Sequence, residues 1–233
     1  MNTPPRILNG ILSVTLPLLF VLAASAQYSE PPAQPAEIEA AYTIAIDKRA
    51  AAIVEALKLS DSGKAARVTE VLTNQYRSLR ARDEAIDAKI KAQAKEGAKI
   101  ERASLFPSMS APLHEKFLSR LATDLTPEQI ETVKDKMTYG KVKVTYDAYC
   151  AIVPNLTEKE KERILEELKG ARDEAIDGGS ADEKSAIFQK HKDKINEYLT
   201  TQGHDVAKAY ADWNAKQALA QKKDESKGSQ QTK

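Results

Sequence analysis

Apolar residues recur every three or four positions along most of this chain, which is the spacing of one face of an α-helix. The longest such stretch runs from residue 62 to residue 95. Its apolar positions are Ala65, Val68, Leu72, Tyr76, Leu79, Ile86 and Ile90. At 1.5 Å per residue, this helix would be about 50 Å long. A shorter helix with the same spacing is expected over 37–59. The pattern therefore predicts an all-α fold with one long helix.

Later helices are expected where Ser or Thr is followed three residues on by Glu or Gln. The pairs are Thr126 with Gln129, Thr157 with Glu160, and Ser180 with Glu183. In this capping box the hydroxyl accepts a hydrogen bond from the third helical N–H, and the longer side chain bonds back. These starts and the apolar spacing predict helices at 113–123, 126–153, 157–178, 181–201 and 204–222.

Two segments interrupt the helical pattern. Residues 96–112 contain Gly97, Pro107 and Pro112, and we expect them to form a connection. Residues 141–146 read K-V-K-V-T-Y, and this alternation could form a short strand. The neighbouring apolar positions largely continue a helical face, which favours helix here.

The string A-R-D-E-A-I-D occurs at 81–87 and again at 171–177, each time downstream of a helix start. One such unit cannot bury its own apolar stripe. We therefore expect the copies to pack together as a multi-helix bundle or as stacked helical hairpins. Each copy places two aspartates four residues apart, which is unfavourable unless a cation answers them. We expect a solvated face with partners on the same helix rather than a metal site; the pairs would be Arg80–Glu84, Asp87–Lys91 and Lys169–Asp173.

The chain divides into four parts. Residues 1–26 have one charged residue, a short apolar run and Ala-Ser-Ala at the end, which is typical of a cleaved signal peptide. Residues 27–37 form a proline-rich linker, 38–221 a single helical domain with an internal repeat, and 222–233 a disordered tail without apolar residues. The mature protein would be periplasmic or secreted, with no membrane span.

Charge and cysteine content narrow the function classes. Removing Arg6 with the signal peptide takes the formal net charge from +1 to zero, and charge is spread evenly along the chain. Nucleic-acid binding is therefore not expected, because it requires a basic surface. Cys150 is the only cysteine, so no internal disulfide can form. We expect it to pack as a small apolar residue rather than to act as a nucleophile.

No motif for catalysis or cofactor binding is recognisable. His114, His191 and His204 are far apart and belong to no zinc motif, and the chain has no phosphate-binding glycine loop and no G-x-S-x-G. His114 could act as a general base, but a lone histidine is more often a packed or surface residue. We expect no catalytic residue, no metal and no cofactor, so the balance is against an enzyme.

The best candidate for a binding surface is the stretch 137–149. It contains tyrosines and lysines around Gly140; they are Tyr139, Lys141, Lys143, Tyr146 and Tyr149. Tyrosine is amphipathic and suits sugar stacking or protein interfaces. In the alternative interpretation, which we prefer, Tyr146 and Tyr149 belong to the core.

Several motifs in order resemble a known family. They are L-T-P-E-Q at 125–129, M-T-Y-G at 137–140, L-T at 156–157, N-E-Y-L at 196–199 and Q-G at 202–203. Together they resemble the bacterial exported family catalogued as domain of unknown function 3826, over about residues 40–210. The resemblance implies export and a frequent gene context of polysaccharide degradation, but no known activity. Leu125 to Gln129 also resembles the helix starts of periplasmic chaperones of the Spy and CpxP type.

Two functions follow from these observations. The first, which we favour, is a non-enzymatic interaction or chaperone-like protein of the cell envelope, able to oligomerise and to hold protein clients on a concave helical surface. The second is an accessory carbohydrate-binding protein or enzyme of polysaccharide utilisation. It would have an oligosaccharide pocket lined by Tyr139, Tyr146 and Tyr149, with a pair of carboxylates if it cleaves glycans.

Overall fold

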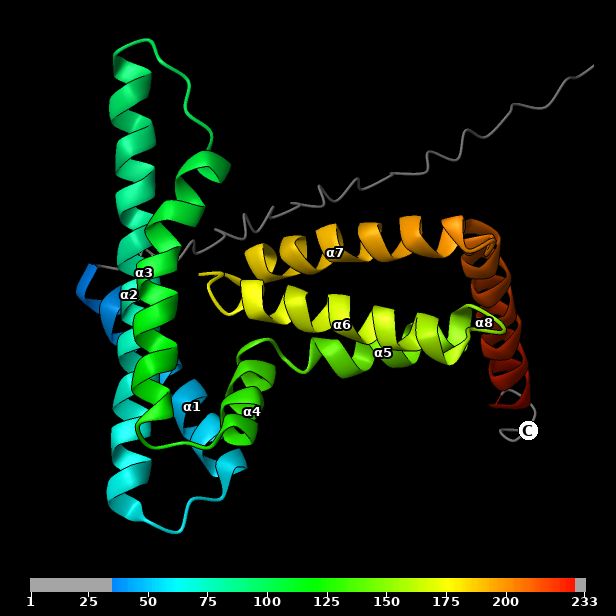
Figure 1. Cartoon of the computed structure of the whole chain (residues 1–233), viewed down its shortest axis with the longest axis horizontal. Helices are drawn as coiled ribbons and strands as arrows, with labels where there is room; N and C mark the ends of the chain where they lie inside the picture. Colours follow the sequence, from blue (N-terminus) through cyan, green and yellow to red (C-terminus); the bar gives the residue numbers. More distant parts are fainter. Residues whose placement is uncertain (1–34, 229–233) are drawn as a thin grey trace, which may run out of the picture.

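The computed structural model describes residues 35–228, and these form eight α-helices and no strand (Figure 1). The helices are α1 Pro35–Leu57, α2 Ser62–Lys95, α3 Arg102–Ala122, α4 Pro127–Met137, α5 Lys141–Ile152, α6 Glu158–Ala175, α7 Ala181–Thr201 and α8 Val206–Gly228. The all-α prediction is confirmed, and the long helix has the predicted bounds. None of the described helices is long and apolar enough to cross a membrane.

The predicted ends of the chain are only partly within this range. The expected signal peptide and most of the proline-rich linker lie outside the described residues, as do residues 229–233. Helix α1 begins at Pro35, so the last three residues of the expected linker are helical. Helix α8 continues to Gly228, past residue 222, where the disordered tail was expected to begin.

The three predicted helix starts are confirmed. Thr126 and Thr157 each form a complete capping box with the Gln or Glu three residues later. Ser180 accepts a hydrogen bond from the backbone N–H of Glu183, as predicted, but the Glu183 carboxylate bonds the N–H of Gly179 instead of returning to Ser180. Local capping therefore fixes where α4, α6 and α7 begin.

Two sequence predictions are wrong. The expected connection at 96–112 is helical from Arg102, with Pro107 and Pro112 inside α3. Each proline removes one helical hydrogen bond, so packing of α3 along α2 outweighs that loss. Residues 141–146, where a strand was the alternative, are the first part of α5, so the favoured helix is confirmed. The single helix expected over 126–153 is broken between α4 and α5, where Tyr139 and Gly140 both adopt the left-handed conformation with φ of 60° and 64°.

The apolar side chains form two cores. Helices α1 to α4 enclose one core, which includes Leu72, Phe117 and Met137, and we call them the first bundle. Helices α5 to α8 enclose the other, which includes Tyr149, Leu168 and Leu199, and we call them the second bundle. In Figure 1, α2 and α3 stand as an upright hairpin, α5 to α7 lie across it, and α8 closes the far end.

The two bundles meet at the turn between α6 and α7. Ile176, just after α6, is fully buried in the core of the first bundle. Helix α6 also contacts α4 directly. In Figure 1 this turn points at the α2–α3 hairpin. The turn therefore joins the bundles, and the polar residues around it form the most elaborate network among the described residues.

Candidate functional site

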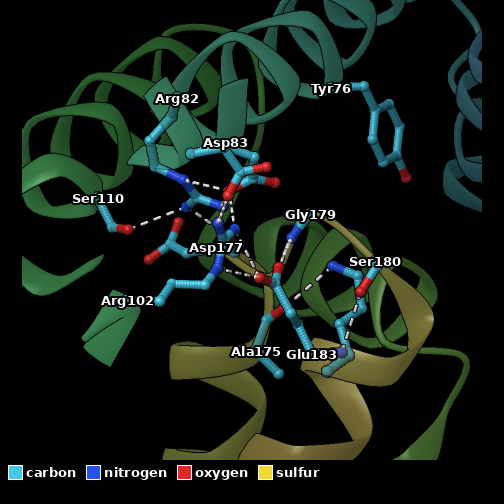
Figure 2. Close-up of polar contacts among 12 residues, drawn as sticks. Tyr76, Arg82, Asp83, Arg102, Ser110, Ala175, Asp177, Gly179, Ser180 and Glu183 are labelled. Atoms are coloured by element: carbon cyan, nitrogen blue, oxygen red, sulfur yellow. Dashed lines mark hydrogen bonds and ion pairs between the residues drawn. The ribbon is translucent and has the colours of Figure 1, made fainter. Parts of the chain in front are cut away.

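Arg82 of α2 is the centre of the network at the junction, and its guanidinium is buried (Figure 2). Its Nη1 donates to the backbone oxygen of Asp177 at 2.6 Å and to Ser110 Oγ at 2.9 Å. Its Nη2 donates to Asp83 at 2.7 Å. The ring of Phe106 lies against it, 4.5 Å from ring centroid to guanidinium carbon. A buried cation requires such complete pairing, so Arg82 ties α2, α3 and the α6–α7 turn together.

Helix α3 supplies one polar face to this network. Arg102, Phe106, Ser110 and His114 are spaced four residues apart, which places them on the same side of the helix. Arg102 bonds Asp83 at 2.6 Å and Asp87 at 3.0 Å, and it reaches Glu183 of α7 at 2.7 Å. Arg102 therefore forms ion pairs with both aspartates of the first repeat copy.

His114 and Asp177 form a second contact between the bundles. His114 Nδ1 lies 2.9 Å from Asp177 Oδ2. This hydrogen bond raises the pKa of His114 above its ordinary value of 6.5, although partial burial opposes the charged form. The other carboxylate oxygen of Asp177, Oδ1, is buried and has no hydrogen-bond partner.

Two glycines allow the α6–α7 turn to approach α2 and α7 closely. A Cβ on Gly179 would lie 1.8 Å from Asp83 Oδ2, so no side chain fits there. A Cβ on Gly178 would lie 2.9 Å from Cγ of Lys184. The pair Gly178-Gly179 thus sets how tightly the second bundle docks onto the first.

The second repeat copy forms an equivalent contact between the bundles, and we call each buried arginine with its partners in the opposite bundle a latch. Arg172 of α6 is buried like Arg82 and likewise bonds the aspartate that follows it, Asp173, at 3.2 Å. It also bonds Asp135 at 2.9 Å and Glu131, both on α4. Each copy therefore sends a buried arginine to the opposite bundle.

The intrahelical pairs expected for the repeat form only in part. Arg80 bonds Glu84 as predicted, at 3.0 Å. Asp87 pairs with Arg102 instead of Lys91, and Asp173 pairs with Arg172 and Lys134 instead of Lys169. The predicted partners were wrong for these two aspartates, because residues distant in the sequence supply closer cations, although both side chains remain largely exposed.

A cavity of about 270 Å³ opens beside this network, and we call it the junction pocket. Its walls come from α1, α2, the end of α4 with the α4–α5 turn, and the α6–α7 turn with the start of α7. Its polar and aromatic lining consists of Arg49, Tyr76, Lys136, Tyr139, Ser180 and Lys184. A smaller cavity of about 170 Å³ shares Arg49, Tyr76 and Gly179 with it, so the two are adjacent.

Burial changes the acid–base properties of two residues in the pocket wall. Desolvation lowers the pKa of Lys184 to about 8, and the Asp177 carboxylate partly offsets this effect. Lys184 Nζ donates to the backbone oxygen of Ala175 at 3.0 Å. Burial raises the pKa of Tyr76 to about 12, so its phenol stays neutral. At neutral pH the pocket wall therefore remains cationic.

The structure separates the residues of the predicted binding surface. Tyr139 is about half exposed and lines the junction pocket. Tyr149 is buried, with its hydroxyl 2.8 Å from Asn196 Oδ1 in the second bundle. Tyr146 packs against the same core. Lys141 bonds Ser185 at 2.7 Å and Lys143 bonds Asp147 at 2.6 Å, both on the surface.

The remaining candidate residues also have defined surroundings. His191 bonds Glu167 and Glu174, and His204 bonds Glu160. Cys150 is exposed, contrary to the expectation that it packs as an apolar residue, because it lies on the outer face of α5. Among the described residues, no group of three or more His, Cys, Asp or Glu is arranged to hold a metal ion.

Sequence reasoning singled out the repeat aspartates, His114 and Tyr139, but it missed the other junction residues. The stretch expected to be a connection contains Arg102, Phe106 and Ser110, so their common face was not considered. Their regular spacing of four residues, continued by His114, was the available signal. Arg49 and Lys184 gave no signal, since nothing in the local sequence distinguishes them from the other basic residues of the predicted helices.

The fold and this site define an all-helical protein with a cationic pocket where two bundles meet. The chain matches the family model described as "Protein of unknown function (DUF3826)" over residues 43–218, well over half of its length. It belongs to that family, as its motifs indicated. No curated protein matches the chain.

Proposed function

We propose that this protein binds an anionic carbohydrate, such as an oligosaccharide that carries uronic acids, in the junction pocket. The observation that carries this proposal is the charge of the pocket lining. Arg49, Lys136 and Lys184 are its ionisable cations, and no Asp or Glu is among the described residues that line it. A guanidinium can bind a carboxylate through two parallel hydrogen bonds, which supports a role for Arg49.

The uncharged part of the lining suits a sugar. Tyr76 and Tyr139 provide aromatic surface, and Ile53 and Met137 add apolar contacts. Tyrosine combines an apolar ring with a polar hydroxyl, so it can contact both the C–H face and the hydroxyls of a sugar. The first turn of α7 also borders the pocket, and the positive end of its dipole favours an anion.

This proposal agrees with the polysaccharide context that the family resemblance implies. It also agrees with export, which we propose from the signal peptide at residues 1–26 and which would place the protein in the periplasm or outside the cell. The proposed role is non-enzymatic. Asp83 and Asp87, which line the adjacent smaller cavity, and Glu183 are all paired with Arg102.

A chaperone-like role, which the sequence favoured, has less support. Holding unfolded clients requires a continuous apolar surface. The large apolar side chains that are exposed among the described residues are Ile38, Ile44, Tyr139, Val144 and Leu219. They are spread over α1, the α4–α5 turn, α5 and α8. We therefore place this role second and make it an outcome of the test.

Calorimetric titration with trigalacturonate, and with maltotriose as an uncharged control, tests the proposal. We expect trigalacturonate to bind and maltotriose to bind much more weakly. Arg49→Ala should weaken trigalacturonate binding by roughly ten- to a hundredfold, since a hydrogen bond to a charged group contributes about 1.5–3 kcal/mol. Lys143→Ala removes the same charge from α5, outside the pocket, and should leave the affinity unchanged.

Two results would contradict the proposal. One is the absence of any trigalacturonate binding, and the other is equal binding by the wild type and the Arg49→Ala variant. If the protein instead slowed aggregation of an unfolded client equally well in both forms, the chaperone-like role would replace it.

A further inference from the structure

A second cavity lies between α2 and α3, away from the junction, and we call it the α2–α3 groove. Its volume is about 440 Å³. Helix α2 contributes Asn74, Gln75, Arg77 and Ser78, and helix α3 contributes Lys116 and Arg120. Lys116 follows His114 by two residues, which is about 200° around the helix. The groove therefore lies on a different side of α3 from the network around Arg82.

The positive charge of the groove is not neutralised within the protein. Among the described side chains, Arg77, Lys116 and Arg120 form no ion pair and no side-chain hydrogen bond. Lys116 and Arg120 are four residues apart on one helical face, where like charges repel. The nearest acid on that face is Asp124, which is bound by Arg67 at 2.5 Å. No Asp or Glu is among the described residues that line the groove.

Gln75 provides an independent observation that points to a ligand. It is 5% exposed and lines the groove, and its side-chain Nε2 is buried without a hydrogen-bond partner. A buried donor without an acceptor is costly, so such groups are rare unless something binds them. Gln75 lines the groove together with three cations, and an oxyanion is the class of ligand that accepts hydrogen bonds from such donors.

We propose that the α2–α3 groove binds an oxyanion group, a sulfate, phosphate or carboxylate, carried by a small polar molecule. Arg77, Lys116 and Arg120 supply the charge, Gln75 supplies the buried donor, and Ser78 can contact the uncharged part of the ligand, whereas the Asn74 amide donates to Glu70 at 3.4 Å. The binding energy comes from charge-assisted hydrogen bonds in a concave site. This inference is independent of the proposed carbohydrate binding in the junction pocket.

Calorimetric titration with inorganic sulfate, inorganic phosphate, glucose 6-phosphate and galacturonate tests the inference at low salt. We expect at least one of the four to bind with a Kd below about 10 mM. The ligand that binds most tightly identifies the oxyanion and shows whether a sugar ring contributes to the affinity. The double variant Lys116→Ala/Arg120→Ala should weaken this binding at least tenfold.

The control variant is Lys89→Ala/Lys91→Ala, which removes the same charge from the exposed end of α2, outside the groove. It should change the affinity less than twofold. Gln75→Leu keeps all three cations and removes only the unpartnered amide. It should also weaken binding, while its thermal midpoint stays at or above that of the wild type.

Three results would overturn the inference. The first is that none of the four anions binds in this concentration range. The second is that the two double variants weaken binding equally, which would indicate general attraction to positive charge. The third is that Gln75→Leu binds as the wild type does. Arg49→Ala should leave groove binding intact, so a failure here is distinguishable from a failure in the junction pocket.

Discussion

Asp177 accepts hydrogen bonds from two helices of the first bundle although it belongs to the second. Arg82 of α2 bonds its backbone oxygen, and His114 of α3 bonds its side chain. Both contacts are at least partly shielded from water, so each is stronger than a surface ion pair. Asp177, the last residue of the second repeat copy, therefore contributes much of the contact between the bundles. Because its side chain bonds the titratable His114, this contact depends on pH.

The free energy of unfolding should include a His114 contribution that depends on pH. The pKa of His114 is raised in the folded protein, so this contribution is complete below about pH 6.5, the value for the unfolded chain. It is lost as the pH rises through the raised folded value. Urea unfolding at pH 5.5 and pH 8.5 should show the wild type losing about 1 kcal/mol more than His114→Gln over this interval. Equal losses in both proteins would contradict the assignment.

At the scale of the elements, local sequence signals predicted helix starts well and helix ends less well. A capping box depends only on residues close in the sequence, and the boxes at Thr126 and Thr157 form as predicted. One helix was predicted across Gly140 because the apolar spacing continues on both sides of it. The start of α3 was missed because Pro107 argues locally against helix, whereas packing along α2 is a tertiary effect that local patterns do not contain.

Two glycine substitutions should have opposite effects on stability. Gly140 has φ of 64° with nothing within 4 Å of an added Cβ, so Gly140→Ala meets only backbone strain and should cost about 1 kcal/mol. Gly170 is inside α6, and its added Cβ would be an ordinary 3.7 Å from His191. Gly170→Ala should stabilise by up to about 1 kcal/mol through helix propensity. Thermal unfolding of the two variants checks both signs, and a destabilised Gly170→Ala would disprove this view of α6.

For the whole molecule, the repeat explains how two cores become one structure. The arginine of each copy is buried and reaches the opposite bundle, Arg82 to the α6–α7 turn and Arg172 to α4. The duplication was visible in the sequence, and so was the need for a cation near its aspartates. The partners of these charged residues could not be seen in the sequence, because they lie up to 95 positions away. The junction pocket exists only where these long-range contacts hold the bundles together, and for that reason it could not be predicted.

Removing either latch should therefore loosen the bundles from each other. Arg82→Leu should cost about 3 kcal/mol, because it leaves the Asp177 backbone oxygen without its donor and removes one of the two arginines that pair with Asp83. Arg172→Leu should act similarly through Glu131 and Asp135. Arg163 bonds only Glu166 and Glu167 on its own helix, so Arg163→Leu is a control that should cost under about 0.5 kcal/mol. Scanning calorimetry should resolve two transitions in the latch variants and one in the control; one unchanged transition in all three would refute the latch.

The central claim is that the place where the bundles meet is a ligand site. Hydrogen–deuterium exchange with and without trigalacturonate tests it most directly, because amide protection reports binding segment by segment. We predict slower exchange at residues 136–140 and 176–184, which border the junction pocket, and unchanged exchange in α8. Protection confined to α5 and α8, or no protection at saturating ligand, would contradict the account.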